Sequence, residues 1–214
     1  MTKRKYKGPM TAQEHADILE ADPEWCARRD ERERKRQKRS DEIGENERPL
    51  VEALNAAGCH VTSVWDLVNR DKKDYDDVVP ILGEHLERDY WPEILEGIAR
   101  AMAVGVPAMP YRPIMIRMFC QKPLLKDNVR DGLAIAIDAT TGPHNVWETI
   151  ELLRDGSLGE NRLFMLHGMR KSKDPFVRQA ILDLRISHPE LALEIGSISW
   201  VKKLDKEAKT DPPT

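Results

Sequence analysis

The sequence predicts an all-α protein in which about four helical hairpins stack behind a charged, helical N-terminal extension. Apolar residues recur at i, i+3, i+4 and i+7 through eight consecutive segments, which is the spacing of amphipathic helices. Gly, Pro, Asn or Asp residues stand in the breaks between these segments. No segment alternates as a half-buried strand does, and aromatic residues make up only 6% of the 214 residues, too few for a typical all-β sandwich.

The N-terminal elements begin with a basic tip, residues 1–10, which its composition predicts to be disordered. Thr11 and Glu14 form a capping-box pattern, which predicts a short helix directly after the tip. Asp22 followed by Pro23 predicts a second helix, with Asp22 as its N-cap.

The segment Arg28–Glu42 has no apolar residue and therefore cannot bury a face. Its Arg, Glu, Lys and Gln residues are good helix formers, and Glu31 and Lys35 form a favourable i, i+4 pair. These features predict an exposed helix that runs into the next one, at Glu47–Ala57. The charged helical extension is placed at residues 11–57.

Gly58 is a predicted helix C-cap, and residues 58–204 are predicted to form the helical repeat domain. A short apolar turn at 63–68 comes first. The eight amphipathic segments that follow are predicted to be helices at Val78–Arg88, Trp91–Val104, Tyr111–Gln121, Lys126–Ala139, Asn145–Asp155, Glu160–Lys171, Pro175–Ile186 and Pro189–Val201. The polar tail, residues 205–214, is predicted to be disordered.

An internal repeat favours stacked hairpins over a simple bundle. The string Glu96–Ala101 returns 35 residues later as Asp131–Ala136, and the helix before each copy also matches. A period of this length that contains two helices is typical of helical hairpins that bury their apolar sides on their neighbours. Glycine inside a helix costs about 1 kcal/mol relative to alanine. We therefore expect Gly97 and Gly132 to mark places where two helices approach closely.

Two strings carry a resemblance to a known family. Asp174–Ala180, which continues to Leu184, is similar to the consensus of HEAT repeats, and so is Asp127–Leu133. The repeat region as a whole resembles small bacterial HEAT-repeat proteins, which implies a short right-handed α-solenoid. The charged helix and residues 61–76 depart from the HEAT pattern and are expected to cap one end of the stack.

Known catalytic and cofactor motifs are missing from the sequence. It contains no P-loop, no G-x-G-x-x-G, no G-x-S-x-G and no C-x-x-C. Three widely spaced cysteines do not suggest a disulfide framework and favour a cytoplasmic location. No apolar run is long enough to cross a membrane, and the basic N-terminus lacks the apolar stretch of a secretory signal. We predict no enzymatic activity, no cofactor, no metal and no membrane partner.

A helical stack offers partners an extended concave face, lined by the second helix of each pair. The polar side chains predicted to bind a partner protein there are Glu96, Arg100, Arg130, Asp138, Arg162 and Arg170. Glu96 and Arg100 also fit a local i, i+4 ion pair. The predicted function is a protein-binding scaffold. Its narrower form is a stoichiometric inhibitor, such as an immunity protein that neutralises a toxin, and a structural subunit of a larger assembly remains an alternative.

Nucleic-acid binding is the alternative from another class. Residues 1–40 hold 12 Lys and Arg against 8 Asp and Glu, whereas the remaining residues hold 22 against 29. The candidate nucleic-acid-binding arm consists of Arg28, Arg29, Arg32, Lys35, Arg36 and Arg39. Its acidic neighbours and its lack of aromatic residues weigh against this hypothesis. Some HEAT-like proteins are DNA glycosylases, and Trp147, Asp131 and Arg130 are the residues that such an enzyme would use here.

Overall fold

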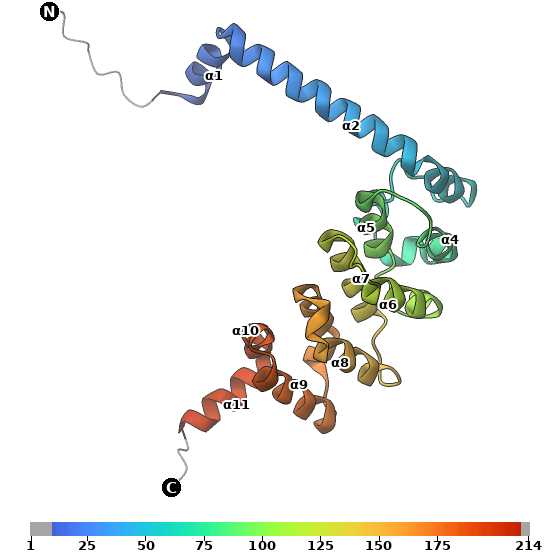
Figure 1. Ribbon diagram of the computed structural model, residues 1–214, viewed down its shortest axis with the longest axis vertical. Coiled ribbons are helices and arrows are strands. Elements are labelled where there is room, and N and C mark those ends of the chain that lie inside the picture. Colours follow the sequence, from blue (N-terminus) through green and yellow to red (C-terminus); the bar gives the residue numbers. More distant parts are fainter. Residues whose placement is uncertain (1–9, 211–214) are drawn as a thin grey trace, which may run out of the picture. The chain divides into compact units, whose positions relative to one another are not determined.

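The computed structural model describes residues 10–210, and over that range the chain is all-helical, without a β-strand (Figure 1). The predicted all-α class is therefore confirmed. The chain forms two compact units, Met1–Glu45 and Asn46–Thr214. The predictions for the N-terminal tip and for the last four residues lie outside the described residues, Met10 excepted. No helix between residues 10 and 210 combines the length and the apolar content that crossing a membrane requires.

The first unit contains α1 (Ala12–Glu20) and the beginning of α2 (Pro23–Ala56). The predicted capping box is present: Thr11 Oγ1 accepts from the N–H of Glu14 (3.2 Å), and Glu14 Oε2 accepts from the N–H of Thr11 (2.9 Å). Asp22 Oδ1 accepts from the N–H of Glu24 (2.9 Å), as expected of an N-cap. The charged segment is helical throughout and continues without a break to Ala56, as predicted.

The second unit begins with the last turns of α2, which ends at Ala56. Gly58 has φ +85°, and the N–H of Cys59 reaches back to the carbonyl of Leu54 (3.0 Å), so Gly58 serves as the predicted C-cap. The Glu47 carboxylate accepts from the N–H of Val64 (2.6 Å), just before the short helix α3 (Trp65–Val68). This contact fixes the segment after α2 against its last turns.

Four pairs of helical elements follow in chain order (Figure 1). They are α4 (Val79–His85) with α5 (Pro92–Ala101), α6 (Arg112–Cys120) with α7 (Asp127–Ala139), α8 (Val146–Arg154) with η5 (Glu160–Leu166), and α9 (Pro175–Ser187) with α10 (Pro189–Ser197). The second elements pack on one another in succession: α3 on α5, α5 on α7, α7 on η5 and η5 on α10. Short 3-10 helices lie in the connections between these elements, at Lys72–Asp74, Asp76–Val78, Val106–Tyr111, Gly156–Leu158 and Gly168–Lys171.

The two repeated glycines lie where neighbouring elements approach each other closely. A Cβ atom at Gly132 of α7 would lie 3.0 Å from the Ala99 Cβ of α5. A Cβ atom at Gly97 of α5 would lie 2.4 Å from Val64 Cγ1, next to α3. The expected close approach is confirmed at both positions, and the segment around α3 takes the place of a preceding second helix.

Three predictions about element boundaries are wrong. The segment Glu160–Lys171 is not one α-helix but two 3-10 helices, η5 and η6 (Gly168–Lys171). At the start of η6, the backbone N–H of Gly168 donates to Asp138 Oδ1 (2.7 Å) of α7. The last predicted helix breaks at Ile198, whose backbone is extended, and α11 (Ser199–Thr210) follows.

The third error concerns the C-terminal tail, because its first six residues, predicted to be disordered, belong to α11. Val201 of this helix is fully buried, and Arg185 of α9 donates two hydrogen bonds to the Asp205 carboxylate (2.8 and 2.9 Å). These tertiary contacts outweigh the polar composition from which disorder was predicted.

Candidate functional site

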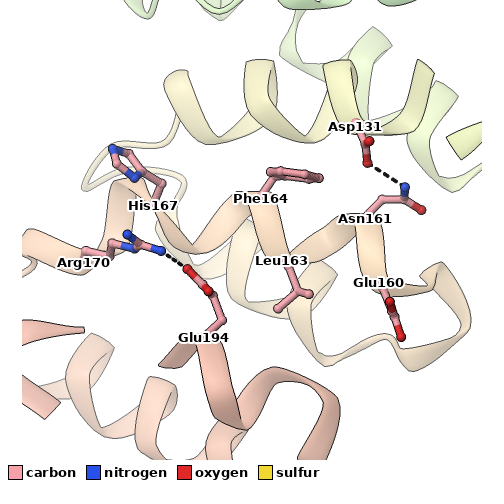
Figure 2. A pocket seen from close by; sticks show the side chains of 8 residues that line it. All are labelled: Asp131, Glu160, Asn161, Leu163, Phe164, His167, Arg170 and Glu194. Atoms are coloured by element: carbon pink, nitrogen blue, oxygen red, sulfur yellow. Dashed lines mark hydrogen bonds and ion pairs between the residues drawn. The ribbon is translucent and has the colours of Figure 1, made fainter. Parts of the chain in front are cut away.

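A pocket of about 550 Å³ opens on the side of the second elements, the face predicted to bind a partner (Figure 2). Its lining comes from α7, η5 with the turn that follows, η6 and α10. The lining residues are Asp131, Glu160, Asn161, Leu163, Phe164, His167, Arg170 and Glu194. We call this cavity the Phe164 pocket, because Phe164 is the aromatic residue in its wall.

Asn161 fixes one side of the pocket. Its amide donates to Asp131 Oδ1 (2.7 Å) and to the carbonyl of Asp127 (3.2 Å), which ties the first turn of η5 to α7 (Figure 2). Its Oδ1 atom accepts a hydrogen bond from the buried Arg130. With both polar atoms of its side chain engaged in three hydrogen bonds, Asn161 orients the residues that follow it in η5.

Phe164 is 45% exposed in the pocket wall, while the next two residues of η5, Met165 and Leu166, are fully buried. An exposed aromatic ring in a concavity offers apolar contact area at a low cost in side-chain entropy. Such rings are frequent among the residues that dominate binding energy in protein interfaces. The exposure of Phe164 therefore makes it the principal candidate for contact with a ligand.

The charged groups of the pocket are predominantly acidic. Asp131, Glu160 and Glu194 contribute three carboxylates, against the single guanidinium of Arg170. Arg170 pairs with Glu194 across η6 and α10, at the opposite end of the pocket from Asp131 (Figure 2). These four groups together carry a net charge of −2, so they attract a cationic group more strongly than an anionic one.

Three of the six predicted partner-binding residues are accessible. Glu96 and Arg100 of α5 are partly exposed and form a 2.8 Å ion pair, so the local i, i+4 contact is present. Arg170 lines the Phe164 pocket.

The other three, Arg130, Arg162 and Asp138, are buried, and the expectation that they contact a partner is corrected. Arg130 donates to the carbonyl of Leu158 and lies 4.6 Å over the ring of Phe119. These contacts join α7 to the elements on both sides of it. A buried guanidinium needs such acceptors, and the pattern of residue types does not reveal them.

Arg162 and Asp138 also connect neighbouring pairs. Arg162 is 1% exposed and donates to the carbonyl of Asp155 (2.6 Å) and to the Glu190 carboxylate of α10. Burial raises the pKa of Asp138 to about 6, and the N–H of Gly168, which donates to its carboxylate, partly opposes this rise. Both side chains have structural roles below the surface.

Sequence reasoning missed Arg112, at the start of α6. Its buried guanidinium donates to the carbonyl of Ile137 (2.7 Å), to Thr149 Oγ1 (2.7 Å) and to the Glu148 carboxylate (2.8 Å). It also donates to Thr140 Oγ1 (2.9 Å). Arg112 thus joins three helices, and no motif in the sequence marks it for this role.

The residues proposed for a glycosylase do not form an open catalytic group. Arg130 is buried, and its two terminal nitrogens donate to Asn161 and to the carbonyl of Leu158, so it is not accessible to a base. Asp131 is bonded to Asn161, and Trp147 lies on α8, a first helix of its pair. Between residues 10 and 210 no three His, Cys, Asp or Glu side chains are grouped as metal ligands are.

The arm predicted to bind nucleic acid lies on α2, in the first unit, and is helical and exposed. Several of its basic side chains pair with acidic neighbours on the same helix, for example Arg28 with Glu24 (3.5 Å) and Lys35 with Glu31 (3.5 Å). These local pairs agree with the expectation from the sequence.

No protein-family model, no curated protein and no solved structure matches this chain.

Proposed function

We propose that this chain is a protein-binding module of the α-solenoid type, without enzymatic activity, that holds a partner protein on the face of its second elements. The single observation that carries the proposal is the Phe164 pocket, which presents an exposed aromatic ring on that face. A concave site with an aromatic wall and a few polar groups is the usual form of a binding site.

A repeated contact supports the solenoid arrangement. Glu96 Oε2 accepts from the amide of Asn128 (2.8 Å), and Asp131 Oδ1 accepts from the amide of Asn161 (2.7 Å). Glu96 and Asp131 occupy the same position of the 35-residue repeat. The same contact thus joins α5 to α7 and α7 to η5, as expected if one packing arrangement is propagated along a stack.

The chemistry of the pocket suggests which part of the partner enters it. A volume of about 550 Å³ accommodates one or two side chains. A Lys or Arg side chain of the partner would place its cation over the face of Phe164 and between the carboxylates of Asp131 and Glu160. The proposed ligand is therefore an exposed basic segment of a cytoplasmic protein. An inhibitor of the immunity-protein type is the narrower form of this proposal and rests on analogy.

The test compares two phenylalanines. Tagged wild-type chain, Phe164→Ala and Phe176→Ala are used to recover partners from nuclease-treated lysate of the source cells, and the eluates are analysed by mass spectrometry. Phe176 lies on α9, is 73% exposed and is not in the pocket lining, so its substitution controls for the loss of an exposed aromatic ring.

A partner recovered by the wild type and by Phe176→Ala, but lost with Phe164→Ala, supports the proposal. A partner that both variants retain excludes the pocket as the contact. If nuclease treatment removes every bound protein, the protein-binding function itself is wrong.

A further inference from the structure

The basic residues of α2 are not distributed evenly around the helix. At 3.6 residues per turn, successive side chains are separated by about 100° around the helix axis. Six basic side chains fall within an arc of about 120° on this geometry. They are Arg28, Arg29, Arg32, Lys35, Arg36 and Arg39, and we call them the basic stripe.

The acidic residues of the same helical segment lie outside the stripe. All seven Asp and Glu residues between Pro23 and Glu45 project from the remaining part of the helix circumference. The other two basic residues, Arg34 and Lys38, lie among these acidic residues and pair with Glu31 and Glu42. The segment therefore has one cationic face, although its total charge is close to neutral.

The ion pairs at the edges of the stripe do not neutralise it. Arg36 and Glu33 are 3.7 Å apart, and the two side chains are 81% and 68% exposed. The Arg28–Glu24 and Lys35–Glu31 pairs, both at 3.5 Å, and the Arg29–Asp30 pair, at 3.0 Å, are also exposed. Exposed pairs of this kind contribute little and exchange readily for a stronger anion. The stripe is thus available to a ligand with many negative charges.

The dimensions of the stripe fit the phosphates of a nucleic-acid duplex. From Arg28 to Arg39 the helix rises about 17 Å, at 1.5 Å per residue. Duplex DNA carries one charge per about 1.7 Å of its axis, or about ten charges over this length. Five of the six stripe residues are arginines, whose planar guanidinium groups bind phosphate oxygens in a bidentate manner.

Two other ligands fit less well. A membrane surface is disfavoured because Arg28–Glu42 has no apolar residue that would insert between lipids. Single-stranded nucleic acid is disfavoured because its binding relies on stacking of bases on aromatic rings. The nearest aromatic ring on the helix, Trp25, already has the Arg29 guanidinium 5.3 Å from its centre.

We infer that the basic stripe of α2 binds the phosphate backbone of duplex nucleic acid, without reading its sequence. This function is separate from the Phe164 pocket and does not rest on it. Phosphate contacts alone give sequence-independent binding that weakens steeply as salt increases.

Two double variants of the full chain test this inference. Arg32→Gln with Arg36→Gln removes two charges from the stripe, and Arg34→Gln with Lys38→Gln removes two charges from elsewhere on the same turns of α2. Both variants change the net charge equally and keep good helix formers, and circular dichroism checks that the helix is retained. Binding of a fluorescent random-sequence DNA duplex is measured by anisotropy in a KCl series.

The stripe variant is expected to lose about tenfold or more in affinity, and the slope of log K against log[salt] should become shallower by about 1.8, or 0.9 per lost contact. The Arg34/Lys38 variant should bind within about twofold of the wild type, since phosphate contacts are lost only where a side chain faces the duplex. Equal losses in the two variants would overturn the inference, because only net charge would then matter.

Absence of salt-dependent binding by the wild type would also overturn it, and so would preferential binding of poly-glutamate in competition with the duplex. Phe164→Ala is expected to bind the duplex as the wild type does. A negative result for the basic stripe therefore does not affect the proposed protein-binding function. A negative result for the Phe164 pocket does not affect the inference about the stripe.

Discussion

Asn161 donates a hydrogen bond to Asp131 at 2.7 Å, and its own amide oxygen accepts from the guanidinium of Arg130. One asparagine therefore satisfies a carboxylate in the pocket wall and a buried cation below it. Asn161 therefore links the pocket wall to the core, because its side chain contacts both the Asp131 carboxylate and the buried Arg130 guanidinium of α7.

Substitution of Asn161 by Ala is expected to lower the free energy of unfolding by about 2 to 3 kcal/mol, because a buried group that loses its partner pays its full desolvation cost. Urea unfolding followed by circular dichroism measures the change. Glu160→Ala, at the exposed neighbouring position, is the control and should change stability by less than about 0.5 kcal/mol. Equal effects of the two substitutions would contradict the role given to Asn161.

A second prediction concerns the buried guanidinium of Arg112. Arg112→Ala removes the donor from the carbonyl of Ile137 and from Thr149, and should cost about 3 to 5 kcal/mol, as breaking a buried charge network does. Arg112→Lys should restore little of this loss, because an ammonium group cannot replace a planar fork of donors.

Arg117, an exposed residue of the same helix α6, provides the matched control for Arg112. Its exposed ion pair with Glu87 is worth at most about 1 kcal/mol, so Arg117→Ala should leave the urea midpoint almost unchanged. If Arg112→Lys is as stable as the wild type, the fork geometry is unimportant and the interpretation fails.

Local patterns in the sequence predicted most helix positions, because caps and amphipathic spacing depend on neighbours in the chain. Thr11, Asp22 and Gly58 each act as predicted. The site was predicted less well. Arg130 and Arg162 belong to second elements of their pairs but are buried. Their guanidinium groups donate to carbonyls outside their own helical elements, and these contacts cannot be read from the local sequence.

The Phe164 pocket escaped prediction for a related reason. The segment that contains Phe164 was expected to be an α-helix, whereas its 3-10 geometry decides which of its apolar residues faces outward. A 3-10 helix turns every three residues, so it distributes the side chains differently from the α-helical pattern. The exposure of Phe164 is therefore a consequence of the 3-10 geometry of η5.

Gly97 and Gly44 should respond to alanine in opposite directions. A Cβ atom at Gly97 would lie 2.4 Å from the buried, stiff side chain of Val64, so Gly97→Ala should destabilise the second unit by about 1 to 3 kcal/mol. Gly44 has no neighbour within 4 Å of the equivalent atom, and Gly44→Ala should favour the helical state of α2 by about 1 kcal/mol.

Urea unfolding tests Gly97→Ala, and the temperature dependence of the helical circular dichroism signal tests Gly44→Ala. Destabilisation by both substitutions would show that helix propensity and close packing are not separated in this way.

The buried carboxyl of Asp138 predicts an unusual dependence of stability on pH. Burial raises the pKa of this group from 3.8 to about 6, so between these values the native state binds more protons than the unfolded state does. The contribution of Asp138 to stability therefore falls as the pH rises from about 4 to about 6, and is constant above that range.

Asp138→Asn keeps an oxygen that accepts from the N–H of Gly168 but cannot ionise. The free energy of unfolding of this variant minus that of the wild type should therefore increase by about 2 kcal/mol as the pH rises from 4 to 7. Urea unfolding at four pH values measures the difference, from which the other carboxylates cancel because both proteins contain them. Parallel curves for the two proteins would show that Asp138 is ionised in the native state throughout this range, and that its burial is compensated by the N–H of Gly168 and by the nearby guanidinium of Arg170.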